Sequence, residues 1–144
     1  MLHRVKRPND IHQGKWNGLG GKMMPGETPE ECVIREVREE SGLEIRAPKL
    51  CGILTFPNFD GRHDWYGFVY TTSDFEGELM SDPPEGDLAW IEDSRLLELP
   101  MWEGDRIFIG WIHEGRFFSA KFCYENGIFK GHEVAFHDTP RVWK

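Results

Sequence analysis

The stretch TPEECVIREVREESG, from Thr28 to Gly42, constrains the fold most, because it carries the start and stop signals of one helix. Thr28 can cap the helix N-terminus, Pro29 suits the first helical position, and Glu31 can complete a capping box. Gly42 suits the left-handed position just past a helix end. The sequence therefore predicts a helix from Pro29 to about Ser41.

The rest of the chain reads as alternating strands and helices. Strands are expected in LHRV, LEIRAPKLCGILTFP, HDWYGFVYTTSDFEGEL and DLAWIED, and Asn126-Gly127 marks the turn of a C-terminal hairpin. A helical turn is expected in SRLLELP, a second main helix in WEGDRIFIGWIHEG, and a long polar loop in KRPNDIHQGKWNGLGGK. This order predicts one α/β domain over residues 1–144, with helices packed against a mixed sheet.

The composition is typical of a soluble globular protein, with 39% hydrophobic and 29% charged residues. The sequence shows no signal-peptide core and no apolar run of membrane-span length, and its three cysteines lack metal-site spacing, so we expect a cytoplasmic protein with reduced thiols. The net charge of −8 disfavours long nucleic acid as a partner. An anionic substrate would therefore need a bound cation to neutralise it.

The predicted helix places Glu36, Glu39 and Glu40 on one stripe, because positions i, i+3 and i+4 are neighbours on a helix surface. Helix physics alone favours a solvated acidic face, on which nearby arginines offset part of the repulsion. The preceding Gly20-Gly21 pair favours a second interpretation, because glycine lets the backbone approach a ligand closely. Magnesium prefers oxygen ligands, so carboxylates beside such a loop also fit a magnesium site.

Gly21, Glu27 and the run REVREESGL, from Arg35 to Leu43, have the residue types and spacing of the Nudix signature. The chain thus resembles the MutT-like Nudix hydrolases. This resemblance implies an α/β/α sandwich with a mixed β-sheet. It also implies a hydrolase that cleaves nucleoside diphosphate derivatives, with Mg²⁺ as the cofactor and Mn²⁺ as a substitute.

The resemblance also assigns roles to residues by position. The metal ligands that it implies are the carboxylates of Glu36, Glu39 and Glu40 and a backbone carbonyl, either that of Gly21 or that of Gly20. The catalytic residues that it implies are Arg35, Glu39, Glu40 and Glu85. Arg35 would pair with Glu27 to brace the loop against the helix and fix the direction of the metal ligands. Glu85 would reach the metal site from a later loop as ligand or base, and the alternative is an ordinary loop carboxylate.

A narrower resemblance lies in GKWNGLGGK and LPMWEGDRIF, which are similar to the branch that hydrolyses oxidised purine nucleoside triphosphates such as 8-oxo-dGTP. The base-binding residues that it implies are Asn17, Phe56, Trp102, Asp105 and Phe108. An asparagine offers a purine edge both a donor and an acceptor, and stacking on an aromatic ring contributes about 1–3 kcal/mol per base. The alternative is that Asn17 forms a turn and Trp102 anchors its helix. This chain has Gly104-Asp105 where the branch has two aspartates, which leaves open the choice between oxidised guanine and oxidised adenine.

The sequence thus predicts a pyrophosphohydrolase that converts oxidised purine nucleoside triphosphates to monophosphate and pyrophosphate, acting as a monomer or homodimer. One alternative is another Nudix activity, on ADP-ribose or on RNA 5′ ends. The other is a nucleotide-sensing module with little turnover.

The start of the chain suggests that the usual first strand of such a domain is missing, because MLHRV falls where a second strand is expected. An uncovered strand edge invites pairing with another chain. The open interpretations are a reading frame that begins upstream, an edge covered by a second copy or by the tail HDTPRVWK, and a smaller sheet.

Overall fold

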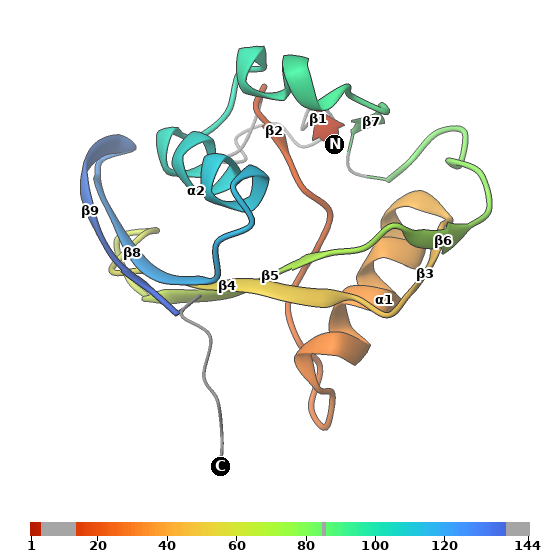
Figure 1. Ribbon diagram of the computed structural model, residues 1–144, viewed down its shortest axis with the longest axis horizontal. Helices are drawn as coiled ribbons and strands as arrows, with labels where there is room; N and C mark the ends of the chain where they lie inside the picture. The colour runs from red at the N-terminus through yellow and green to blue at the C-terminus, as the bar shows by residue number, and fades with distance from the viewer. Residues whose placement is uncertain (4–13, 85, 138–144) are drawn as a thin grey trace. The chain divides into compact units, whose positions relative to one another are not determined.

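The computed structural model describes residues 1–3, 14–84 and 86–137 of the chain. The chain divides into two compact units, the first formed by Met1–Pro48 with Thr72–Trp102, and the second by Lys49–Thr71 with the residues from Glu103 onward. Figure 1 labels the helices and strands of both units. None of the helices that the structure describes has the length and hydrophobicity needed to cross a bilayer. A single domain over residues 1–144 stays a prediction.

In the first unit, helix α1 (Pro29–Ser41) begins and ends where the sequence predicts. The Thr28 hydroxyl accepts a hydrogen bond from the Glu31 amide at 3.1 Å, and the Glu31 carboxylate accepts one from the Thr28 amide at 3.4 Å. Gly42 ends the helix with a φ of 84°, in the left-handed region that favours glycine. The capping signals are local in sequence, and they form as predicted.

Two small antiparallel sheets accompany α1 in the first unit. In one, β1 (Leu2–His3) lies between β2 (Trp16–Asn17) and β7 (Asp87–Leu88). In the other, β3 (Glu44–Arg46) pairs with β6 (Asp74–Glu76). The buried core of this unit consists of Val37, Leu43 and Ile45, with Leu19, Val33, Ile34 and Leu79 packed against it. Val33, Ile34 and Val37 therefore form the apolar side of α1.

The second unit contains a four-stranded sheet with the order β5-β4-β8-β9. Its strands are β4 (Lys49–Phe56), β5 (Trp65–Thr71), β8 (Phe118–Glu125) and β9 (Ile128–Phe136). Strands β4 and β8 run parallel and the other neighbours antiparallel, so the predicted mixed sheet is confirmed. The β8–β9 hairpin turns at Asn126-Gly127, whose φ angles of 52° and 79° both lie in the left-handed region, as predicted.

Helix α2 (Glu103–His113) packs on one face of this sheet. Its apolar residues recur at helical spacing, which gives the helix one apolar side. That side consists of Ile107, Phe108, Trp111 and Ile112. It covers the buried side chains of Leu54, Phe118, Ala120 and Phe122. Burying each of these phenylalanines contributes about 1.5–3 kcal/mol, so this packing holds α2 on the sheet.

Several helices and strands of the structure differ in length from those predicted from the sequence. The segment LEIRAPKLCGILTFP divides into β3 and β4, because Ala47 between them has a φ of 48° and cannot continue a strand. DLAWIED contributes only the two residues of β7, and SRLLELP forms the 3₁₀ helix η1 (Asp93–Glu98). The predicted polar loop contains β2, where the Trp16 amide donates to the Pro100 carbonyl at 2.8 Å.

Candidate functional site

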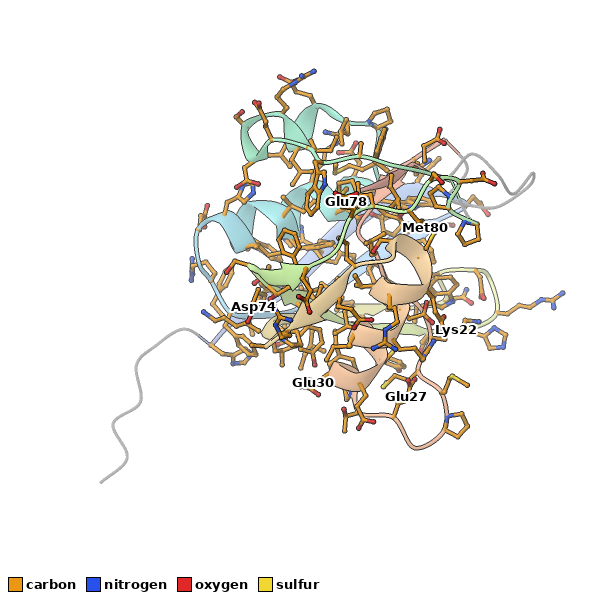
Figure 2. The ribbon with its side chains drawn as sticks, turned by 90° about the vertical axis from the view of Figure 1, so that its right-hand side faces the viewer. Lys22, Glu27, Glu30, Asp74, Glu78 and Met80 are labelled. Carbon is orange, nitrogen blue, oxygen red and sulfur yellow. The ribbon has the colours of Figure 1, made fainter. Side chains whose placement is uncertain are left out.

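Arg35 on α1 is the central contact between the helix and the loop before it. Its Nε lies 2.6 Å from Glu27 Oε2 and its Nη2 lies 2.9 Å from Glu27 Oε1, so the ion pair is bidentate. The same Nη2 donates to the Lys22 carbonyl at 3.1 Å. Figure 2 labels Lys22 and Glu27 on the loop beside α1. The contact between Arg35 and Glu27 that the sequence predicts is therefore present.

The contacts of Glu27 also set its ionisation. Hydrogen bonds from the Arg35 side chain and then from the Met24 amide, at 2.7 Å, lower the pKa of Glu27 to about 2. The same pairing raises the pKa of Arg35 above its ordinary value. Both groups are therefore charged throughout the neutral pH range, and the loop is held by a permanent ion pair.

Arg35 also reaches two carboxylates of its own helix. Its Nη1 donates to Glu36 Oε1 at 2.8 Å and to Glu39 Oε2 at 3.2 Å. The Glu36 side chain is 16% exposed, whereas that of Glu39 is 57% exposed. One guanidinium nitrogen therefore draws both carboxylates together, and Glu39 remains open to solvent.

Two glycines of the loop make room for the carboxylates of α1. A Cβ at Gly21 would lie 2.4 Å from the Glu36 Cδ, so a larger residue at this position would displace the Glu36 carboxylate. The Gly20 amide donates to Glu40 Oε2 at 3.3 Å, and Glu40 is only 7% exposed. The solvated acidic face that helix physics alone favours is therefore wrong for Glu40, which is turned toward the loop.

These donors fit a hard divalent cation. Glu36, Glu39 and Glu40 offer carboxylate oxygens, and the Gly21 carbonyl accepts a weak hydrogen bond from the Cys32 thiol at 3.7 Å. Within residues 1–3, 14–84 and 86–137, no three His, Cys, Asp or Glu side chains are arranged to enclose a metal by themselves. Magnesium usually takes one or two carboxylates and completes its shell with water and substrate phosphate, so this open set suits it. Glu85 lies outside the described residues.

The residues predicted to bind a base lie in both units. Asn17 and Trp102 belong to the first unit, where the hydrogen bond from Trp16 to Pro100 joins their neighbouring segments. Asn17 Oδ1 is buried, and it has no hydrogen-bond partner among the described residues. A buried acceptor without a partner costs free energy, so a ligand that donates a hydrogen bond to it would recover that cost.

The second unit holds the other predicted base-binding residues, Phe56, Asp105 and Phe108. Phe56 and Phe108 pack against Phe122 with ring centroids 6.0 Å and 6.3 Å away, so both contribute to the core. Asp105 lies in the first turn of α2, and burial raises its pKa to about 7. A carboxyl with such a pKa carries a proton in a large fraction of molecules near neutral pH and can then donate a hydrogen bond.

Sequence reasoning missed two side chains beside the predicted ones. The Lys15 Nζ lies 4.5 Å from the centroid of the Trp102 ring, which is a cation–π contact within the first unit. In the second unit the Tyr124 hydroxyl contacts Gly104, next to Asp105. Each contact joins segments far apart in the sequence, so no local pattern indicates it.

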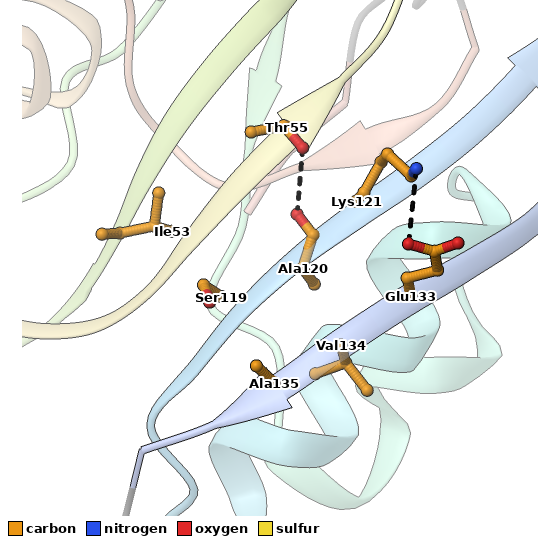
Figure 3. A pocket seen from close by; sticks show the side chains of 8 residues that line it. All are labelled: Ile53, Thr55, Ser119, Ala120, Lys121, Glu133, Val134 and Ala135. Carbon is orange, nitrogen blue, oxygen red and sulfur yellow. Dashed lines mark hydrogen bonds and ion pairs between the residues drawn. The ribbon is translucent and has the colours of Figure 1, made fainter.

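A cavity of about 400 Å³ lies on β4, β8 and β9 in the second unit (Figure 3). Its lining includes the ion pair between Lys121 and Glu133, with Nζ 3.4 Å from Oε2. None of the described residues that the sequence predicts for the site lines this cavity.

The chain is similar to known proteins along most of its length. A family model described as NUDIX domain matches residues 2–112. The chain is 36% identical over 107 residues to the uncharacterized Nudix hydrolase YvcI of Bacillus subtilis, across 72% of this chain and 68% of that protein. It is 31% identical over 125 residues to the oxidized purine nucleoside triphosphate hydrolase of Danio rerio, across 84% and 74% of the two chains.

Two further matches bear on substrate and fold. Over 77 residues the chain is 36% identical to the ADP-ribose pyrophosphatase of Methanocaldococcus jannaschii, across 54% of this chain and 46% of that protein. The crystal structure of a MutT protein from Bacillus halodurans matches with a TM-score of 0.80 at 32% identity, across 90% of this chain and 86% of that chain. The predicted fold class, a mixed sheet with helices, is confirmed by this structural neighbour.

Proposed function

Because the chain belongs to the Nudix family, whose hydrolases act on pyrophosphate bonds and generally use divalent metal ions, we propose that it hydrolyses purine nucleoside triphosphates. The products are the nucleoside monophosphate and pyrophosphate. Mg²⁺ is the proposed cofactor, and oxidised purines such as 8-oxo-dGTP are the proposed substrates. The net charge of −8 favours small nucleotides over long nucleic acid.

The observation that carries this proposal is the position of Arg35, which joins Glu27 of the loop to Glu36 and Glu39 of α1. The contacts of Arg35 direct these carboxylates of α1 toward the loop, at the glycine pair Gly20-Gly21. The carboxylates of Glu36, Glu39 and Glu40 and the Gly21 carbonyl would hold Mg²⁺. A bound Mg²⁺ polarises phosphate oxygens and lowers the pKa of a coordinated water.

Side chains of the protein would orient the metal-binding carboxylates and accept the proton of the attacking water. Arg35 keeps the Glu36 and Glu39 carboxylates pointed in one direction, which is how outer contacts tune a metal site. The exposure of Glu39 supports a role in accepting the proton of the attacking water. Glu85 stays a prediction for the same role, because it lies outside the described residues.

The buried, unpartnered Oδ1 of Asn17 supports a purine as the base, because the N–H groups of a purine edge can donate to it. Trp102 would stack on the base, and Asp105 would donate to the base edge in its protonated form. Phe56 and Phe108 would contribute apolar surface.

A substrate panel tests the proposal. The panel contains 8-oxo-dGTP, an oxidised dATP, the two normal nucleotides, ADP-ribose and an RNA with a 5′-triphosphate, each with Mg²⁺. We expect the highest kcat/KM for an oxidised purine triphosphate, with pyrophosphate rather than phosphate released. A preference for ADP-ribose or for RNA would contradict the proposed substrate. Tight nucleotide binding with negligible turnover of every compound would instead indicate a sensing module.

A further inference from the structure

A hydrogen bond joins the first turn of α2 to strand β8 within the second unit. The Gly104 amide donates to the Tyr124 hydroxyl oxygen at 2.7 Å, and Gly104 is buried. Amide groups in the first turn of a helix have no partner within the helix, so the tyrosine provides one from outside. Asp105 follows Gly104 directly, and the same contact therefore fixes the turn that carries Asp105.

The position of Tyr124 also explains why residue 104 is a glycine. A Cβ at Gly104 would lie 2.8 Å from the Tyr124 hydroxyl and 2.9 Å from a ring carbon of Phe122. At Gly110, in the same helix, a Cβ would meet nothing within 4 Å. The glycine at position 104 is therefore required by the approach of Tyr124 and Phe122. The space of a side chain at this position is filled by the tyrosine hydroxyl.

The surroundings keep the tyrosine in place and uncharged. Its ring packs against Phe59 and Phe129, with centroids 5.5 Å and 5.4 Å away. Burial, together with the negative charges of Asp105 and Glu103, raises the pKa of Tyr124 to about 12. Because the hydroxyl stays neutral, it adds no further negative charge beside Glu103 and Asp105 at this end of α2.

We propose that Tyr124 is a positioning residue for Asp105, which it holds half-buried in the first turn of α2 as the acidic group that contacts the purine edge. This inference rests on the proposed function, in which Asp105 meets the base. The chain has Gly104 where the branch that it resembles has a second aspartate. Tyr124 excludes a side chain there and fixes the remaining acid through the backbone.

Among the described residues, Glu103 and Arg106 flank Asp105 on α2, and the Glu103 carboxylate lies 3.7 Å from the Arg106 guanidinium. On β8 the neighbouring titratable group is Tyr124, whose pKa is raised in part by the charge of Asp105. Removing the tyrosine hydroxyl would release the Gly104 amide and let water approach the turn. Both changes favour the charged form of Asp105, so its pKa would fall toward the ordinary value of 3.8.

The test compares Tyr124→Phe with the wild type on 8-oxo-dGTP and on an abasic ribose triphosphate, across a pH series. For the wild type we expect KM for the purine to rise as Asp105 ionises near pH 7. For Tyr124→Phe we expect that rise at lower pH, with KM at neutral pH about three- to tenfold higher, as the loss of one neutral hydrogen bond gives. KM for the abasic compound should not change.

Tyr66→Phe is the control, because Tyr66 lies in the same unit and is 69% exposed. A Tyr124→Phe variant with a lowered melting temperature but an unshifted KM profile would overturn the proposal and assign Tyr124 to the scaffold. If this variant does not fold at the assay temperature, the same measurement is made with Gly110→Ala added to strengthen α2.

Other variants separate this proposal from the proposed function. If Asn17→Ala, Trp102→Ala and Asp105→Ala leave the preference for purine over abasic substrate intact, the proposed function fails and the role of Tyr124 fails with it. If these three variants reduce the preference and Tyr124→Phe does not change the KM profile, only the tyrosine proposal fails.

Discussion

Arg35 and Glu27 form a two-pronged ion pair, in which Nε lies 2.6 Å from Oε2 and Nη2 lies 2.9 Å from Oε1. One residue lies on α1 and the other on the loop before it, so the pair fixes the loop against the helix. Such paired contacts resist rotation of either side chain. Because Arg35 also contacts Glu36 and Glu39, the loop position and the direction of these carboxylates are coupled.

Glu27→Gln tests this coupling. The change keeps the size of the side chain but leaves Arg35 without its charged partner on the loop. We expect kcat/KM with Mg²⁺ to fall roughly 10- to 100-fold, as is typical when an outer contact of a metal site is removed. Glu30→Gln, an exposed carboxylate in the first turn of the same helix, is the matched control (Figure 2). Equal activity in the two variants would show that the ion pair does not support the site.

The raised pKa of Asp105 predicts that the free energy of unfolding falls as the pH rises. Its folded pKa of about 7 exceeds the ordinary value of 3.8, so the folded state binds the proton more tightly than the unfolded state. The stabilisation is full below 3.8 and is lost as the pH rises to about 7. The slope is at most about 1.4 kcal/mol per pH unit. Urea unfolding measured between these pH values should show a fall in the free energy of unfolding with pH in the wild type and a smaller fall in Asp105→Asn. Parallel plots of unfolding free energy against pH for the two proteins would contradict the raised pKa of Asp105.

The two glycines of α2 should respond oppositely to alanine. Gly104→Ala forces a Cβ to within 2.8 Å of Tyr124 and 2.9 Å of Phe122, so we expect a loss of about 1–3 kcal/mol of unfolding free energy. Gly110→Ala has open space and should gain up to about 1 kcal/mol, because alanine favours the helix. Thermal unfolding of both variants checks this. A stabilised Gly104→Ala would show that the close approach of Tyr124 is absent.

The base contacts predict a selective effect on KM. Trp102→Ala should raise KM for a purine triphosphate by about 5- to 150-fold, which corresponds to about 1–3 kcal/mol of stacking. Asn17→Ala should raise it less, because a single hydrogen bond contributes about 0.5–1.5 kcal/mol. Neither change should alter KM for an abasic ribose triphosphate. Steady-state kinetics on both compounds checks this prediction, and equal losses on the two would place both residues in the scaffold.

The sequence predicted those features that depend on neighbours in the chain. The caps of α1 follow from Thr28, Glu31 and Gly42, which lie within or next to the helix that they delimit. The hairpin follows from Asn126-Gly127, whose left-handed conformations suit a two-residue turn. The pair between Arg35 and Glu27 was predicted only through the family signature, since spacing alone does not fix a contact between loop and helix.

The remaining features depend on contacts between distant segments. The burial of Glu40 requires the approach of the Gly20 amide, and helix periodicity does not contain that information. The contact of Tyr124 with Gly104 joins β8 to α2, so the glycine at this position looked like a missing acid rather than a packing requirement. The strands β2 and β7 are short because pairing with β1, and not strand propensity, defines them.

The most direct test of the central claim is the product and metal dependence of hydrolysis by the wild type and by Glu40→Gln. We expect the wild type to release one pyrophosphate per nucleoside monophosphate only when Mg²⁺ is present. We expect Glu40→Gln to keep its helix content and to lose roughly 100-fold or more in kcat, because a metal ion contributes several kcal/mol to such a reaction. Turnover without a divalent metal, release of phosphate alone, or near-normal activity of Glu40→Gln would contradict it.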